Sequence, residues 1–147
     1  MRVCGVEIQG SEAVIALLAL DKGLFELPEC RTRKFILRDD RDQAQLAKFQ
    51  FDVAKLVEDY KIEKLVIKSR PHKGKFAGGA VGFKIEAAIQ LIDGVTVEFI
   101  NGNEIKEQLK RNPVAIDFTA TGLKKFQEHA FNSAYANMIH AMYNKED

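Results

Sequence analysis

The chain has 147 residues, a formal net charge of +1 and 46% hydrophobic residues. This length is typical of one domain with its own core, and the near-neutral charge excludes an overall basic field, so nucleic-acid binding would need a local basic patch. Two cysteines are too few for a metal-binding cysteine cluster. The first residues do not show the pattern of a signal peptide, so we expect none, and no apolar run in the sequence approaches roughly 20 residues. We therefore expect a single cytoplasmic domain over residues 1–147, with reduced thiols and no membrane contact.

The first third of the chain predicts an antiparallel meander. Residues 3–8 form a short strand that is apolar on both faces, which is typical of a central strand, and its one carboxylate, Glu7, lies near the end. Residues 13–20 form a second apolar strand, bounded by turns. A third strand at residues 33–37 is more polar, so we expect it at an edge of the sheet.

The rest of the chain alternates between helices and strands. The pattern predicts helices at residues 41–60, 104–111 and 123–143, and a further helix that follows the glycines after residue 77 and ends at about residue 93. It also predicts strands at residues 64–69 and 95–100. A helix between two strands implies a crossover, so these two strands join the sheet in parallel. The expected α/β fold is a mixed five-stranded sheet, with three antiparallel and then two parallel strands, flanked by helices.

This order of elements resembles the ribonuclease H-like fold, and within it the RuvC-type branch. The resemblance covers nearly the whole chain in pattern, and the stretches that carry it are residues 3–7, 65–68, 78–88, 95–109 and 129–136. In that family the first strand carries an aspartate, the fourth strand ends in a glutamate and the last helix begins with aspartates. The resemblance implies an uncharacterised bacterial family that shares this fold.

The resemblance also implies a place for a two-metal nuclease site, in which carboxylates hold two divalent ions that activate water. Glu7 matches the first ligand, but Lys68 and Asn132 stand where further carboxylates belong. Hard cations need several oxygen ligands, and an ammonium group repels them. We therefore expect a degenerate site without a metal or other cofactor, in which Lys68 reaches Glu7 and Asn132 hydrogen-bonds to either of them. At this pair we favour a buried ion pair kept for structure, and a repurposed phosphate or nucleotide pocket is the alternative.

A basic loop follows the fourth strand and leads into glycines at a helix N-terminus. Basic side chains next to a cleft suit phosphates, and the backbone N–H groups of a helix N-terminus favour anions. The residues predicted to bind a phosphate-bearing ligand are Arg70, His72, Lys73, Lys75, Gly78 and Gly79. The alternative is a solvated loop, with the Gly78-x-x-x-Gly82 spacing serving only close helix packing. The stretch is not a P-loop, because no Gly-Lys-Ser/Thr follows.

Three functions stay open. The first is a non-catalytic domain that binds nucleic acid or a phosphate-bearing ligand at the degenerate cleft, and this is the function we expect. The second is a nuclease or other phosphoryl-transfer enzyme with an atypical site, which would use Mg or Mn and recruit other acids such as Glu98 or Asp117. The third is a structural or interaction module, a homodimer formed through apolar helix faces.

Overall fold

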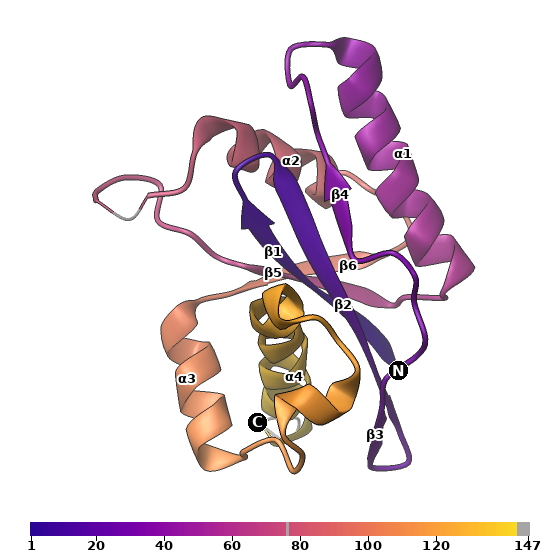
Figure 1. Ribbon diagram of the computed structural model, residues 1–147, viewed down its shortest axis with the longest axis vertical. Helices are drawn as coiled ribbons and strands as arrows, with labels where there is room; N and C mark the ends of the chain where they lie inside the picture. Colours follow the sequence, from indigo (N-terminus) through magenta and orange to yellow (C-terminus); the bar gives the residue numbers. More distant parts are fainter. Residues whose placement is uncertain (76, 144–147) are drawn as a thin grey trace.

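The computed structural model describes residues 1–75 and 77–143, and these form a sheet with helices on both sides (Figure 1). Its strands are β1 Arg2–Gln9, β2 Glu12–Asp21, β3 Leu24–Glu26, β4 Lys34–Ile36, β5 Lys64–Lys68 and β6 Thr96–Ile100. Its α-helices are α1 Gln43–Asp59, α2 Ala80–Gln90, α3 Gly102–Arg111 and α4 Glu128–Tyr143. Two short 3-10 helices, η1 Phe118–Thr121 and η2 Lys125–Gln127, precede α4. None of the described helices is both long and apolar enough to cross a bilayer.

The strand order is β3-β2-β1-β5-β6, with β4 also paired to β2. β1 runs antiparallel to β2, from Arg2 opposite Ala19 to Gln9 opposite Glu12, and parallel to β5 on its other side. β6 continues the sheet in parallel with β5. The expected mixed sheet is therefore confirmed, and β1 is its central strand.

The edge of the sheet beside β2 differs from the single third strand that the sequence predicts. β3 pairs with the end of β2 and β4 with its beginning, so the described chain has six strands instead of five. β3 follows a two-residue turn in which Lys22 and Gly23 have φ values of 52° and 80°, the geometry that suits a tight hairpin. The chain then leaves the sheet at Pro28, which has no N–H group for the strand ladder.

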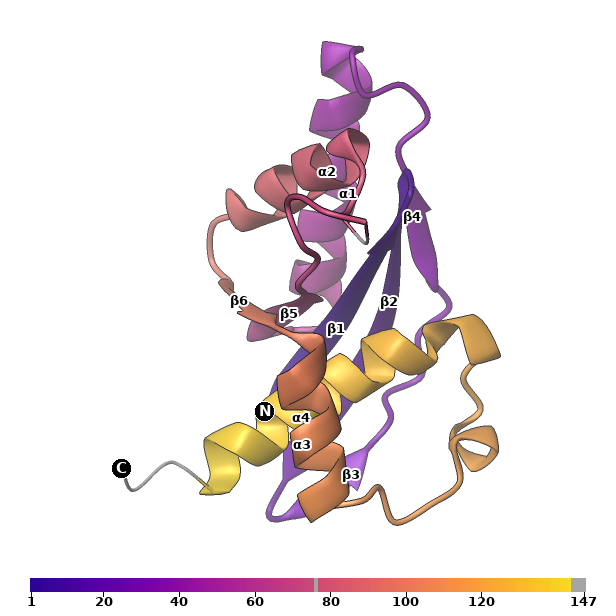
Figure 2. The ribbon, with the colours of Figure 1, turned by 90° about the vertical axis from the view of Figure 1, so that its left-hand side faces the viewer.

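The two faces of the sheet carry separate apolar cores. Figure 2 shows α1 and α2 on one side of the sheet and α3 and α4 on the other. Cys4, Val6 and Ile8 point toward α1 and α2, whereas Val3 packs with α4. Because side chains alternate along a strand, Gly5 and Glu7 lie on the same face of β1 as Val3. Glu7 therefore belongs to the face that α4 covers.

α4 crosses β1 at Gly5. A Cβ atom at this position would overlap the carbonyl oxygen of Ala130 and come within 3.1 Å of the backbone nitrogen of Ala134. A glycine is needed here because the two backbones approach so closely. This contact fixes where the start of α4 lies along β1, close to the end that carries Glu7.

The last helix begins later than the sequence predicts, at Glu128 instead of residue 123. The preceding turn, η2, is held by the side chain of Gln127, which donates to Ile15 O at 2.8 Å and accepts from Lys124 N at 2.9 Å. Phe126 in η2 and Met142 near the end of α4 are 44% and 39% exposed, whereas Ala130, Ala134 and Met138 are buried.

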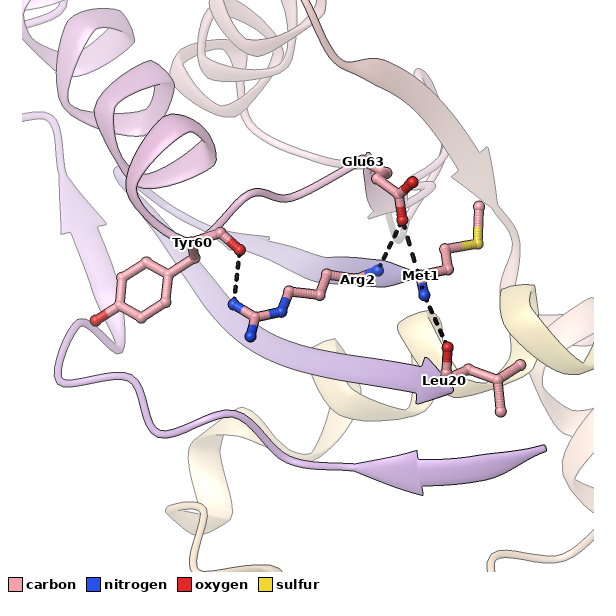
Figure 3. A network of polar contacts seen from close by, with 5 residues as sticks. All are labelled: Met1, Arg2, Leu20, Tyr60 and Glu63. Atoms are coloured by element: carbon pink, nitrogen blue, oxygen red, sulfur yellow. Dashed lines mark hydrogen bonds and ion pairs between the residues drawn. The ribbon is translucent and has the colours of Figure 1, made fainter. Parts of the chain in front are cut away.

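The start of β1 is held by a polar network (Figure 3). The ammonium group of Met1 donates to Leu20 O at 2.7 Å, the backbone N–H of Arg2 donates to Glu63 Oε2 at 3.0 Å, and the Arg2 guanidinium donates to Tyr60 O at 2.9 Å. These bonds join β1 to the end of β2 and to the segment before β5. They lie at the opposite end of β1 from Glu7.

Candidate functional site

Glu7 and Lys68 meet at the carboxyl ends of two neighbouring parallel strands. The register pairs Gly5 with Val66 and Val6 with Ile67, so Glu7 and Lys68 come next on the same face. Lys68 Nζ lies 3.9 Å from Glu7 Oε2. The contact expected between the two side chains is therefore present.

Glu7 is also held by a residue that the sequence analysis did not select. Gln9 donates from Nε2 to Glu7 Oε1 at 2.7 Å, which leaves Oε2 to face Lys68. The Glu7 side chain is only 11% exposed, whereas that of Lys68 is 28% exposed. At 3.9 Å the ion pair is longer than a hydrogen bond, so the Lys68 ammonium keeps room for a further acceptor. The signal for Gln9 was its position two residues after Glu7, on the same face of the strand.

Asn132 lies on α4, but it makes no hydrogen bond to Glu7 or Lys68 in the described part of the chain. Successive residues of an α-helix are about 100° apart, so Asn132 is turned about 160° away from Ala130 and Ala134, whose backbone meets β1. The structure thus brings together Glu7 and Lys68 but not Asn132. Its expected hydrogen bond to this pair is absent because of the helix rotation.

The donor set at Glu7 does not fit two divalent ions. Within residues 1–75 and 77–143, no group of three or more His, Cys, Asp or Glu side chains lies close enough together to hold a metal ion. Glu98 is engaged elsewhere, because it accepts from Asn137 at 3.0 Å and pairs with Lys64 at 3.4 Å. One carboxylate beside an ammonium supplies neither the charge nor the oxygen ligands that such ions require.

Arg70, at the start of the basic loop, is committed to a contact within the fold. Its Nη2 donates to Glu86 Oε2 at 2.9 Å, and its guanidinium carbon lies 4.7 Å from the centroid of the Phe83 ring. A Cβ atom at Gly78 or Gly82 would come within 2.7 or 2.5 Å of guanidinium atoms. The Gly78-x-x-x-Gly82 spacing therefore makes room for an arginine against the start of α2, and not for a second helix.

The other predicted loop residues are divided between the base and the tip. A hydrogen bond of 2.9 Å from Gly78 N to Pro71 O closes the base of the loop. The ring of His72 packs edge-on against Phe83, with centroids 4.7 Å apart. Lys73 and Lys75 are exposed, and Gly79 is the N-cap of α2 without a side-chain cap. Phosphate binding by these residues stays a prediction.

Comparisons with solved structures place this architecture among the RuvC-like proteins. RuvC of Thermus thermophilus superposes with a TM-score of 0.76 at 13% identity, covering 98% of this chain and 97% of that one. The same protein in complex with a Holliday junction gives 0.71 at 13% identity, covering 97% and 96%. The Fowlpox virus resolvase with Holliday junction DNA gives 0.57 at 14% identity, covering 97% and 99%. These identities show the fold alone, and the expected RuvC-type ribonuclease H-like fold is confirmed.

Sequence comparison identifies a family but no characterised relative. No curated protein matches the chain. Residues 1–137 match the family described as "Protein of unknown function (DUF3010)". The uncharacterised family that the sequence analysis expected is therefore this one. The chain belongs to the DUF3010 family of proteins of unknown function.

Proposed function

We propose that this protein binds nucleic acid at the carboxyl ends of β1 and β5 and does not cleave it. The observation that carries the proposal is the Lys68 ammonium, 3.9 Å from Glu7, at the position where the resemblance to RuvC-type nucleases calls for a second metal-binding carboxylate. The similarity to resolvases whose structures contain Holliday junction DNA supports a branched ligand. A cation at this place suits a phosphate, whereas it disfavours a divalent ion.

Local charges must provide the affinity, because the whole chain carries a net charge of only +1. Lys68 is 28% exposed, and Lys73 is exposed on the loop that begins two residues later. Each phosphate contact releases condensed counterions, so binding weakens as salt rises. Contacts from these two lysines predict a slope of log K against log salt of about −2.

The proposal is tested by titrating the protein into a four-way DNA junction, a duplex of matched sequence and a single strand. Fluorescence anisotropy measures the binding to each DNA at several salt concentrations. The double variant Lys68→Gln/Lys73→Gln is expected to weaken junction binding about tenfold or more and to flatten the salt slope. The control Lys48→Gln/Lys55→Gln removes the same charge from exposed positions on α1 and should leave both unchanged. Equal losses in both double variants, or no binding by the wild type at low salt, would contradict the proposal.

The non-catalytic part has its own test. The same substrates are incubated with Mg²⁺ or Mn²⁺, and metal binding is followed by isothermal titration. We expect no cleavage and no tight metal site. Cleavage that disappears in Glu7→Gln would favour the alternative, a metal-dependent nuclease with an atypical site. Sedimentation of the free protein tests the third function, the homodimer, for which the exposed Leu91, directly after α2, and Tyr143, at the end of α4, are the apolar candidates.

A further inference from the structure

A pocket lies at the same end of the sheet as Glu7 and Lys68, on the face that α2 covers. It has a volume of about 560 Å³, within the usual range for small-molecule sites. Its walls come from the segment after β5, from α2 and from β6. The pocket is lined by Ser69, Arg70, His72, Phe83, Glu86, Gln90 and Phe99.

The charges of this pocket do not suit a phosphate. The Arg70 guanidinium is already paired with Glu86 at 2.9 Å, and the two side chains are only 16% and 9% exposed. An incoming phosphate would therefore meet a neutralised cation and a carboxylate. This argues against Arg70 as a phosphate ligand, whereas phosphate binding by the other loop residues stays a prediction. A neutral ligand would not be repelled by the Glu86 carboxylate and would not bring a further charge into the pocket.

The aromatic walls favour a flat ligand. Phe99 projects from β6 and is 39% exposed, which leaves part of its ring uncovered. Phe83 is held in place by the edge of the His72 ring and by the Arg70 guanidinium, each 4.7 Å away. An uncovered, positioned aromatic ring is a surface on which a nucleobase stacks, with little preference for one base over another.

The polar groups of the pocket match the edge of a base. The Gln90 amide can donate and accept, and Ser69 adds a hydroxyl group.

We propose that this pocket holds a nucleobase, either an unpaired base of a nucleic acid or the base of a free nucleotide. If the base belongs to a nucleic acid, the inference rests on the proposed function, since Lys68 and Lys73 would hold the phosphate backbone of that nucleic acid at the same end of the sheet. The pocket then separates base contacts on the α2 face from phosphate contacts on the α4 face and the loop.

The test uses the full chain and a single-stranded oligonucleotide with one 2-aminopurine, whose fluorescence falls when it stacks. Phe99→Leu keeps an apolar side chain but removes the ring, and Gln90→Ala removes the amide. Both are expected to lose most of the fluorescence change and to weaken binding about tenfold. The matched control Phe51→Leu changes a phenylalanine that is 66% exposed on α1, away from the pocket, and should behave as the wild type. Circular dichroism and thermal melting check that each variant is folded.

Two further experiments distinguish a free nucleotide from an unpaired base, and a failure of the base pocket from a failure of nucleic-acid binding. Competition by AMP, GMP, CMP or UMP would assign the pocket to free nucleotides, whereas competition by oligonucleotides alone would assign it to an unpaired base. An oligonucleotide with an abasic site at the probe position should bind more weakly than its parent. If it binds equally well, or if Phe99→Leu keeps the full fluorescence change, the base pocket is wrong although nucleic-acid binding stands. If neither oligonucleotides nor mononucleotides bind, both proposals fail.

Discussion

Among single residues, Cys4 is the clearest case of a side chain whose chemistry is set by its surroundings. It is fully buried in the centre of β1. Burial strongly raises the pKa of the Cys4 thiol, and the nearby Cys30 raises it further, against a small opposing hydrogen bond to the Ala16 backbone. Because the thiolate is the reactive form, Cys4 is expected to be inert in the folded protein.

The raised pKa of Cys4 predicts how stability depends on pH. The unfolded chain releases the thiol proton near the ordinary pKa of 9.0, whereas the folded chain keeps it. The contribution to stability is therefore complete below that pH and is lost as the pH rises toward the folded-state pKa. By pH 10 the loss should be about 1 kcal/mol relative to pH 7. Urea denaturation of the wild type and Cys4→Ala at both pH values measures it.

The comparison with Cys4→Ala removes the effects of other titrating groups. The stability difference between wild type and variant should shrink from pH 7 to pH 10. Cys30→Ala keeps the Cys4 thiol and should keep the pH-dependent loss. If the difference in free energy of unfolding between the wild type and Cys4→Ala stayed constant from pH 7 to pH 10, Cys4 would ionise as easily in the folded chain as in the unfolded one.

The residues of the candidate site show which contacts could be predicted from the sequence and which could not. The Glu7–Lys68 contact was predictable, because two adjacent parallel strands place residues at their ends side by side. The position of Asn132 was not, because it depends on the rotation of α4 about its axis, which the packing of Ala130 against Gly5 decides. The Arg70–Glu86 pair was missed because the two residues are 16 positions apart and no local pattern joins them.

At the scale of elements, the crossing of α4 over β1 is the contact on which the site depends. At Gly5 the side chain is absent and two backbones meet, so an added Cβ atom would press on the Ala130 carbonyl. Neither partner can turn away as a flexible side chain would. A larger residue must therefore push α4 off the sheet, together with the apolar contacts of Ala134 and Met138.

Gly5→Ala is accordingly expected to lower the free energy of unfolding by about 3 kcal/mol or more, because the overlap cannot be relieved by a rotamer change. The matched control is Gly102→Ala in the first turn of α3, where an added Cβ atom would meet open space. It should change stability by less than about 1 kcal/mol. Urea denaturation of both variants gives the comparison. Similar small effects at both positions would show that α4 can move away from β1 without loss.

The elements also differ in how well local patterns predict them. The long strands and α1 follow from apolar periodicity, and their bounds agree closely with the prediction. β3 has three residues, too few for a period to show, and it exists because the turn at Lys22 and Gly23 folds it back on β2. The start of α4 depends on the long-range bond from Gln127 to Ile15. Such tertiary contacts leave no local signal.

At the scale of the whole molecule, stability is expected to be uneven. The six interior residues of β1 are buried, and β1 pairs with strands on both sides. α4 is buried from Ala130 to Ile139 apart from Asn132. α3, in contrast, has Ile105 as its single buried residue. Parts with few buried contacts open without the rest of the molecule.

Native-state hydrogen exchange tests this division. Amide protons in β1, β5 and the middle of α4 should exchange only through global unfolding, whereas those in α3 should exchange at least about 100-fold faster through local opening. Small additions of urea should accelerate the first group strongly and the second group little, because local opening exposes little surface. Equal protection of α3 and β1 would contradict the division. If it holds, Glu7 and Lys68 belong to the part that opens last, so the position of their charges is fixed before any ligand arrives.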